Sequence, residues 1–179
     1  MKKRFSLLFF FVAGILAGLF AKEIQAFLRN LLRDVAPSLM SGYLRQQSTE
    51  DLQNALEASG QRISQKLVEK HPYKFTYWNL RHIIGIEKWG QSRLRVALGE
   101  PFVFDEYDDY RPSNGLSWNE LQDEFAQTRA ETLALISEIR DNDSYHSYRI
   151  LHNEFGELSV DSWLFYLRIH ADNHLLLMR

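Results

Sequence analysis

The amino-acid sequence predicts an all-α protein, in which a four-helix bundle follows an N-terminal hydrophobic segment. Three observations lead to this fold class. Apolar residues recur with the period of an amphipathic helix through most of the chain. Serine, a preferred N-cap residue, precedes three of the expected helices. No stretch alternates apolar and polar residues long enough to indicate a strand. We therefore expect residues 1–45 to form the hydrophobic segment with a connector, and residues 46–179 to form the bundle.

The N-terminal segment is uncharged and almost wholly apolar over residues 5–21, behind the basic run Lys2-Lys3-Arg4. As a helix it would span about 25 Å, slightly less than a hydrocarbon core of about 30 Å. An uncleaved membrane anchor would keep the N-terminus in the cytoplasm. A cleaved signal peptide would end at Ala21, although Leu19 stands where a small residue is preferred. A buried core helix, which would leave the protein cytoplasmic, is the third alternative.

The connector predicts an amphipathic helix that ends at Pro37, followed by a polar connection over residues 36–48. Such a helix could lie on a membrane surface, serve as a stalk or pack on the bundle. Its apolar positions at helical spacing are Ile24, Phe27, Leu28, Leu31, Leu32 and Val35.

The first two bundle helices are predicted from their boundaries. A capping pattern, Ser48-Thr-Glu-Asp51, opens the first, which runs to about residue 69, where His71-Pro72 stops it. The second starts near residue 76 and runs to about residue 98, before Gly99 and Pro101.

The third bundle helix opens with a capping box, Ser117-Trp-Asn-Glu120, and the fourth runs from Ser159 to the end of the chain. About 18 residues separate the second and third helices, which predicts a crossover along the bundle. This segment contains the acidic run 105–109, which could rim a site, bind a cation or form a solvated loop.

Three histidines are candidate metal ligands. His170 and His174 are four residues apart, so on a helix they are separated by only about 40° around the axis. A third imidazole from His82, on the second helix, would complete a facial set with an open position. Such sites hold borderline divalent ions. The alternative is that each is a hydrogen-bonded core histidine.

The order and spacing of three segments resemble the DinB/YfiT-like superfamily of small four-helix metalloproteins. The segments are His82-Ile-Ile-Gly-Ile-Glu87-Lys-Trp-Gly-Gln-Ser-Arg93, Phe125-Ala-Gln-Thr-Arg129-Ala-Glu-Thr-Leu-Ala-Leu and His170-Ala-Asp-Asn-His174-Leu. The resemblance covers roughly residues 49–179. It implies that His82, His170 and His174 bind a divalent metal, usually zinc or nickel. Two features depart from it: Asn173 stands where relatives often have a second histidine, and the N-terminus is of membrane type.

The resemblance also implies a metal-dependent enzyme that acts on a small molecule. Some relatives transfer low-molecular-weight thiols such as bacillithiol or mycothiol, and others look like hydrolases. We expect a thiol S-transferase ahead of a hydrolase, with water or a thiolate on the metal as the reactive group. A non-catalytic, membrane-tethered metal-binding protein is the alternative from another class. The net charge of −2 argues against nucleic acid as a partner. A homodimer is a further possible assembly.

Further residues have weaker assignments. Glu87 and Arg129 match a family pattern in which an ion pair between helices braces the bundle, and two solvated charges are the alternative. His152 could line the pocket as an acid or base, or as a donor to a ligand, although surface or capping duty is favoured. It is also the only nearby histidine that could close the metal site.

Loop positions and pocket walls complete the expectations. His71 and His146 lie in polar loops and are expected in solvent. Trp89 or the crossover 99–116 is expected to form a wall or lid of a pocket between the second and fourth bundle helices. The chain has no cysteine, which excludes disulfides, thiolate metal ligands and a cysteine nucleophile.

Overall fold

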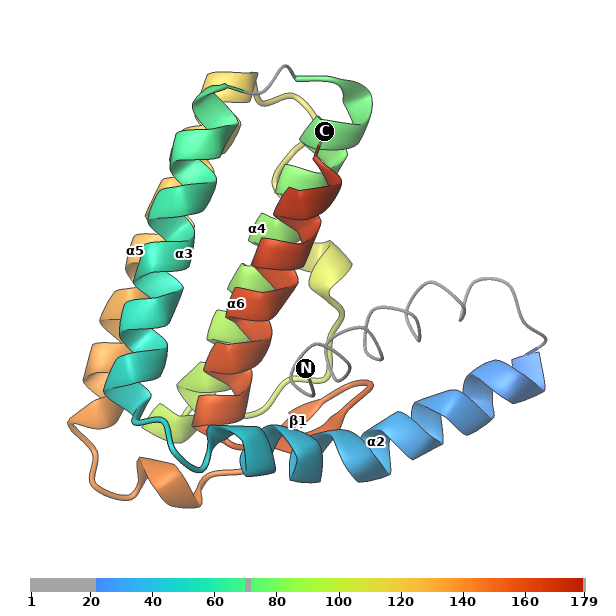
Figure 1. Ribbon diagram of the computed structural model, residues 1–179, viewed down its shortest axis with the longest axis vertical. Helices are drawn as coiled ribbons and strands as arrows, with labels where there is room; N and C mark the ends of the chain where they lie inside the picture. Colours follow the sequence, from blue (N-terminus) through green and yellow to red (C-terminus); the bar gives the residue numbers. More distant parts are fainter. Residues whose placement is uncertain (1–21, 70–71, 179) are drawn as a thin grey trace, which may run out of the picture.

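The structure, a computed structural model, describes residues 22–69 and 72–178 and is built mainly of helices (Figure 1). Four long helices lie side by side, with α3 and α5 on one side and α4 and α6 on the other. They are α3 (Thr49–Val68), α4 (Lys74–Leu94), α5 (Trp118–Arg140) and α6 (Val160–Leu177). A fifth helix, α2 (Lys22–Leu44), lies across one end of the bundle. The predicted bundle of four helices is confirmed.

Serine side chains set three of the helix starts, as the sequence predicts. Ser48 and Ser117 each accept a hydrogen bond from the backbone of the third helical residue, and the side chains of Asp51 and Glu120 bond back. Ser159 accepts from the backbone N–H of Ser162 in the same way. These bonds satisfy amide groups that have no partner inside the helix. The second bundle helix ends in a 3₁₀ turn (Arg95–Leu98), which Gly99 closes with a φ of 92°.

The predicted helix stop at Pro37 is wrong, and so is the polar connection predicted over residues 36–48. Helix α2 continues through Pro37 to Leu44. Proline has no backbone N–H, so it cannot bond the carbonyl of Arg33 one turn earlier. Burial of Ala36, Met40 and Leu44 on one face of α2 outweighs this loss.

A short antiparallel hairpin between α5 and α6 escaped the sequence-based prediction. Strands β1 (Ile150–His152) and β2 (Gly156–Leu158) have three residues each, too few to display a strand pattern. The hairpin packs against α2. Gly156 has a φ of 74°, and a Cβ there would lie 2.9 Å from the carbonyl oxygen of Arg33. Glycine therefore permits both the turn and the contact with α2.

Helices α4 and α6 approach each other closely. A Cβ at Gly90 of α4 would lie 2.6 Å from a methyl carbon of Leu167 on α6, so no larger residue fits without movement. The apolar side chains of Ile83, Ile84 and Leu175 are buried farther along the same pair of helices. This packing brings the faces that carry the candidate ligands together.

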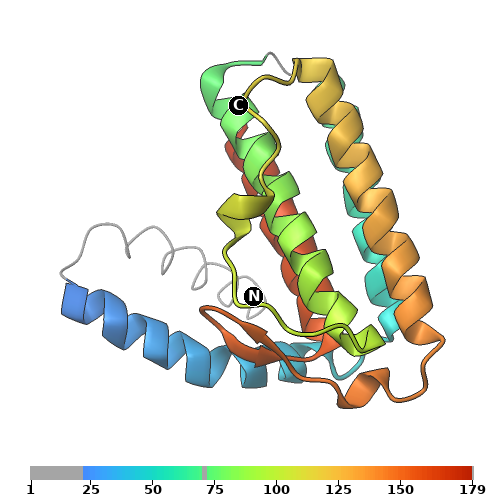
Figure 2. The same ribbon diagram turned by 180° about the vertical axis from the view of Figure 1, so that it is seen from behind.

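The predicted crossover is present and runs beside α4 over residues 99–116 (Figure 2). It contains a 3₁₀ turn (Tyr107–Tyr110), which packs on α4. Buried Arg93 holds the crossover through an ion pair with Asp105 at 2.8 Å, and Trp89 donates to the same carboxylate at 3.0 Å. Asp105 therefore anchors the crossover, whereas Asp108 and Asp109 of the acidic run are exposed.

The hydrophobic run 5–21 lies outside the described residues, so the anchor, the signal peptide and the core helix remain predictions, as does the boundary at residue 45. Within residues 22–69 and 72–178, no helix is both long and apolar enough to cross a bilayer.

Candidate metal centre

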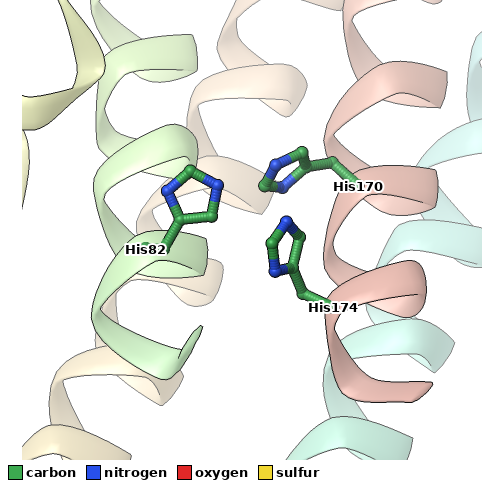
Figure 3. A group of neighbouring side chains, drawn as sticks. All are labelled: His82, His170 and His174. Carbon is green, nitrogen blue, oxygen red and sulfur yellow. The ribbon is translucent and has the colours of Figure 1, made fainter. Parts of the chain in front are cut away.

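The three candidate ligands meet between α4 and α6. Their ring centroids are 5.0 Å apart for His82 and His170, 4.6 Å for His82 and His174, and 4.5 Å for His170 and His174. One nitrogen of each ring lies within 4.8 Å of the corresponding nitrogens of the other two. Figure 3 shows His82 facing the other two rings from the opposite helix. The cluster could hold a metal ion, as the sequence predicts.

Burial keeps the imidazoles neutral. Desolvation, aided by the charges of His174 and Arg111, lowers the pKa of His82 to about 3. Desolvation lowers the pKa of His174 to about 4 and that of His170 well below its usual value. Near pH 7 each ring therefore has one nitrogen with a free lone pair, which is the form that ligates a metal.

Two hydrogen-bonding details fit a metal ion. Nδ1 of His174 lies 2.7 Å from the side-chain oxygen of Asn79, whose amide nitrogen donates to the backbone oxygen of Phe75 at 2.9 Å. An oxygen acceptor places the proton of His174 on Nδ1 and leaves the lone pair on Nε2. Nδ1 of His170 is buried and has no hydrogen-bond partner among the described residues.

The described residues supply three candidate ligands and no fourth. Within residues 22–69 and 72–178, no fourth histidine, aspartate or glutamate joins the group of three. In particular, His152 is not a member, so it does not close the site. Three protein ligands with a vacant position are typical of catalytic metal sites, whereas structural sites have four.

The crossover covers His82. The rings of Trp78 and His82 are stacked, with centroids 5.3 Å apart, and Tyr107 meets His82 edge-on at 5.0 Å. Nη2 of Arg111 lies 3.1 Å from Nδ1 of His82. The crossover therefore forms a wall of the site, whereas Trp89 is buried against His152 and Trp163.

A cavity of about 410 Å³ lies next to this wall. Trp78 lines the cavity and also stacks on His82, so one side chain connects the two. The lining residues carry two positive charges and no negative one; they are Lys74, Phe75, Tyr77, Trp78, Arg81 and Asn114.

The surface position favoured for His152 is wrong, because the side chain is buried with 3% of its surface exposed. Its Nδ1 accepts backbone hydrogen bonds from Glu154 and Phe155 at 3.1 and 3.3 Å, and thereby stabilises the hairpin turn. Burial, with a smaller contribution from the charge of Arg93, lowers its pKa to about 3. His146 is exposed, as predicted, and His71 lies outside the described residues.

The ion pair between Glu87 and Arg129 is present, and the alternative of two solvated charges is wrong. Both side chains are buried, and Nε and Nη2 of Arg129 donate to the two carboxylate oxygens at 2.6 and 2.8 Å. Nη1 donates to the backbone oxygen of Leu56 at 2.6 Å, and the Thr132 hydroxyl donates to Glu87 at 2.9 Å. The pair joins α3, α4 and α5 and is separate from the group of histidines.

Sequence reasoning missed Asn79, Trp78 and Arg111 as neighbours of the ligands. Trp78 stands four residues before His82 on the same helix, a spacing that predicts a contact. Arg111 offers no such signal, because it reaches His82 from the crossover.

Comparison with known proteins gives one match. A sequence model described as the DinB superfamily matches residues 75–178, a range that includes all three histidines. No curated protein and no solved structure matches the chain.

Proposed function

The chain belongs to the DinB superfamily, and from this premise we propose that it binds one divalent ion, zinc or nickel, through His82, His170 and His174. The observation that carries the proposal is the convergence of three neutral imidazoles, one buried and two half-buried, with one nitrogen of each lying within 4.8 Å of the others. Imidazole nitrogens suit both ions.

We further propose that the protein is a metal-dependent thiol S-transferase. A divalent ion held by three imidazoles lowers the pKa of a water or thiol that takes its open position. Around His82 the chain supplies a positive charge at Arg111 and aromatic rings at Trp78 and Tyr107. Among the described residues no carboxylate joins the histidines as a further ligand. These surroundings favour an anionic sulfur nucleophile over base-assisted attack by water.

Metal analysis of the full-length protein tests the first proposal. We expect about one divalent ion per chain, and loss of stoichiometric binding in His170→Ala and His174→Ala. His146→Ala is the matched control, because His146 is exposed and outside the group. Retention of the ion by the double variant of His170 and His174 would exclude the site.

Cobalt substitution and two assays test the second proposal. A small thiol should perturb the visible spectrum of the cobalt protein, and thiol conjugation to an electrophile should outrun ester hydrolysis. Thiol-independent hydrolysis without a spectral response would favour the hydrolase. Inactivity in both assays, with no spectral response, would favour a non-catalytic metal-binding protein.

We also propose that the N-terminal part attaches the protein to a membrane. The support is the uncharged run 5–21 together with an exposed apolar stripe on α2, formed by Leu31, Val35, Leu39 and Tyr43. Full-length protein should fractionate with membranes and resist extraction by high salt, because hydrophobic insertion is not screened. Phe11→Arg combined with Ile15→Arg should release it. Recovery of the intact wild-type chain in the soluble fraction would contradict the attachment.

A further inference from the structure

His82 has a neighbour that conflicts with its role as a metal ligand. Nη2 of Arg111 lies 3.1 Å from Nδ1 of His82. A guanidinium group only donates hydrogen bonds, so Nδ1 must be the acceptor. A neutral imidazole has one N–H, and here that proton must be on Nε2. Figure 3 shows that this second nitrogen is the one facing His170 and His174.

A metal ion at the cluster requires the opposite arrangement. The ion needs the lone pair of Nε2, so the proton must move to Nδ1. Nδ1–H and the N–H of Arg111 would then be two donors facing each other at hydrogen-bonding distance. His174 has no such conflict, because Asn79 presents an oxygen to its Nδ1 at 2.7 Å.

Arg111 has a second partner to which it can turn. The same Nη2 lies 2.9 Å from a carboxylate oxygen of Asp108, which is exposed. The rings of Trp78 and Tyr107 contact the guanidinium, with its central carbon 5.2 and 5.3 Å from their centroids. A small rotation between these rings can break the contact with His82 and keep the ion pair with Asp108, which the guanidinium already forms.

We propose that Arg111 and the metal ion compete for His82, and that metal binding breaks the contact of Arg111 with His82 and leaves Arg111 paired with Asp108 alone. The inference rests on the proposed metal site. It makes Arg111 and Asp108 positioning residues with opposite effects: Arg111 weakens metal binding, and Asp108 strengthens it by offering Arg111 an alternative partner.

Zinc affinity of the full-length protein, measured by competition with a chromophoric chelator, tests the opposite signs. Arg111→Met removes the donor and should tighten binding by roughly tenfold, the low end of effects known for groups that contact metal ligands. Asp108→Asn should weaken binding by about threefold, as fits an exposed ion pair. Asp109→Asn is the matched control, because it removes the same charge from an exposed neighbour that has no contact with Arg111 in the described structure.

A second variant and a second measurement keep the proposal testable if Arg111→Met misfolds. Arg111→Gln offers an amide oxygen to Nδ1, as Asn79 does for His174, and should also bind zinc more tightly. In the metal-free wild type, ¹⁵N NMR of the ring of His82 should find the proton on Nε2. In either Arg111 variant a larger share should be on Nδ1.

The outcomes separate this inference from the proposed function. Equal zinc affinity in the wild type, Arg111→Met and Asp108→Asn, with binding still abolished by His170→Ala, would overturn the competition and leave the metal site intact. A proton on Nδ1 of His82 in the metal-free wild type would also overturn it. Absence of zinc binding in both the wild type and the Arg111 variants would overturn the metal site, and the competition with it.

Discussion

Two polar clusters share helix α4, and they differ in how many of their polar atoms have hydrogen-bond partners. The cluster around Glu87 and Arg129 is closed, because both carboxylate oxygens and all three guanidinium nitrogens have partners. The histidine cluster is incomplete, since Nδ1 of His170 has no partner in the described structure and Arg111 conflicts with the ligand role of His82. Buried polar groups are normally satisfied, so an unpartnered nitrogen among candidate ligands calls for an explanation, and a bound ion is one. The difference separates a satisfied ion pair from a cluster that could hold a metal ion.

The largest expected effect is on the brace. Arg129→Met leaves the carboxylate of Glu87 buried without its counter-charge and should lower the free energy of unfolding by about 3–5 kcal/mol. Urea denaturation measures this loss. The control is Arg62→Met, which removes a more exposed pair with Asp172 and should cost less than about 1 kcal/mol. Equal losses in the two variants would show that Glu87 and Arg129 do not act as a brace.

At neutral pH the histidine cluster should stabilise the fold when it binds its ligand. Zinc at about 100 times its dissociation constant should raise the free energy of unfolding of the wild type by about 2.7 kcal/mol, because only the folded state presents the site. His170→Ala should not respond, His146→Ala should respond fully, and a chelator should reverse the gain. Stabilisation of His170→Ala by zinc would mean that the ion binds elsewhere.

Acid should destabilise the fold through His152. Burial lowers its folded pKa to about 3, whereas its ordinary pKa is 6.5. The unfolded chain therefore takes up the proton first, and stability that is complete above pH 6.5 is lost as the pH falls toward 3. One such group contributes up to about 1.4 kcal/mol per pH unit.

Comparing the wild type with His152→Gln over pH 6.5 to 5 isolates this contribution. Glutamine keeps an acceptor for the turn but does not titrate, so the unfolding free energy of the variant should depend less steeply on pH. Identical slopes in metal-free protein would contradict the assignment.

The smallest predicted effect concerns the orientation of one ligand. Asn79→Ala removes the acceptor for His174 and should weaken zinc binding by about tenfold, or about 1.4 kcal/mol. Asn173→Ala is the control, because it changes the same residue type next to His174 without removing a hydrogen bond found in the described structure. Equal zinc affinities in the two variants would contradict the proposal that Asn79 orients His174.

Local signals explain what could be predicted from the sequence. Ser48 and Ser117 form hydrogen bonds with residues three positions later, so four consecutive residues are enough to predict the start of each helix. His170 and His174 share a helix face for an equally local reason. His82 is a candidate on the sequence alone, but nothing local connects it to α6, and the family resemblance supports its assignment to the same site.

The sequence-based predictions fail where contacts between distant parts of the chain determine the structure. Pro37 is a local stop signal, yet packing of α2 against the hairpin and the bundle overrides it. His152 sits in a short segment between two helices, and its ring packs against Trp89 and Trp163 from two other elements. Arg111 meets His82 only because the crossover lies along α4. No local sequence pattern predicts any of these contacts.

Gly90 limits the distance between the two helices that carry the histidine cluster. All three candidate ligands come from α4 and α6, and the spacing of these helices is limited where Leu167 fits against Gly90. A methyl group at that position would wedge the helices apart and move His82 away from His170 and His174 together. Metal ions differ in bond length by tenths of an ångström, so a substitution remote from every ligand could retune which ion the cluster accepts. Selectivity in this protein could therefore evolve, or be engineered, while all three histidines stay unchanged.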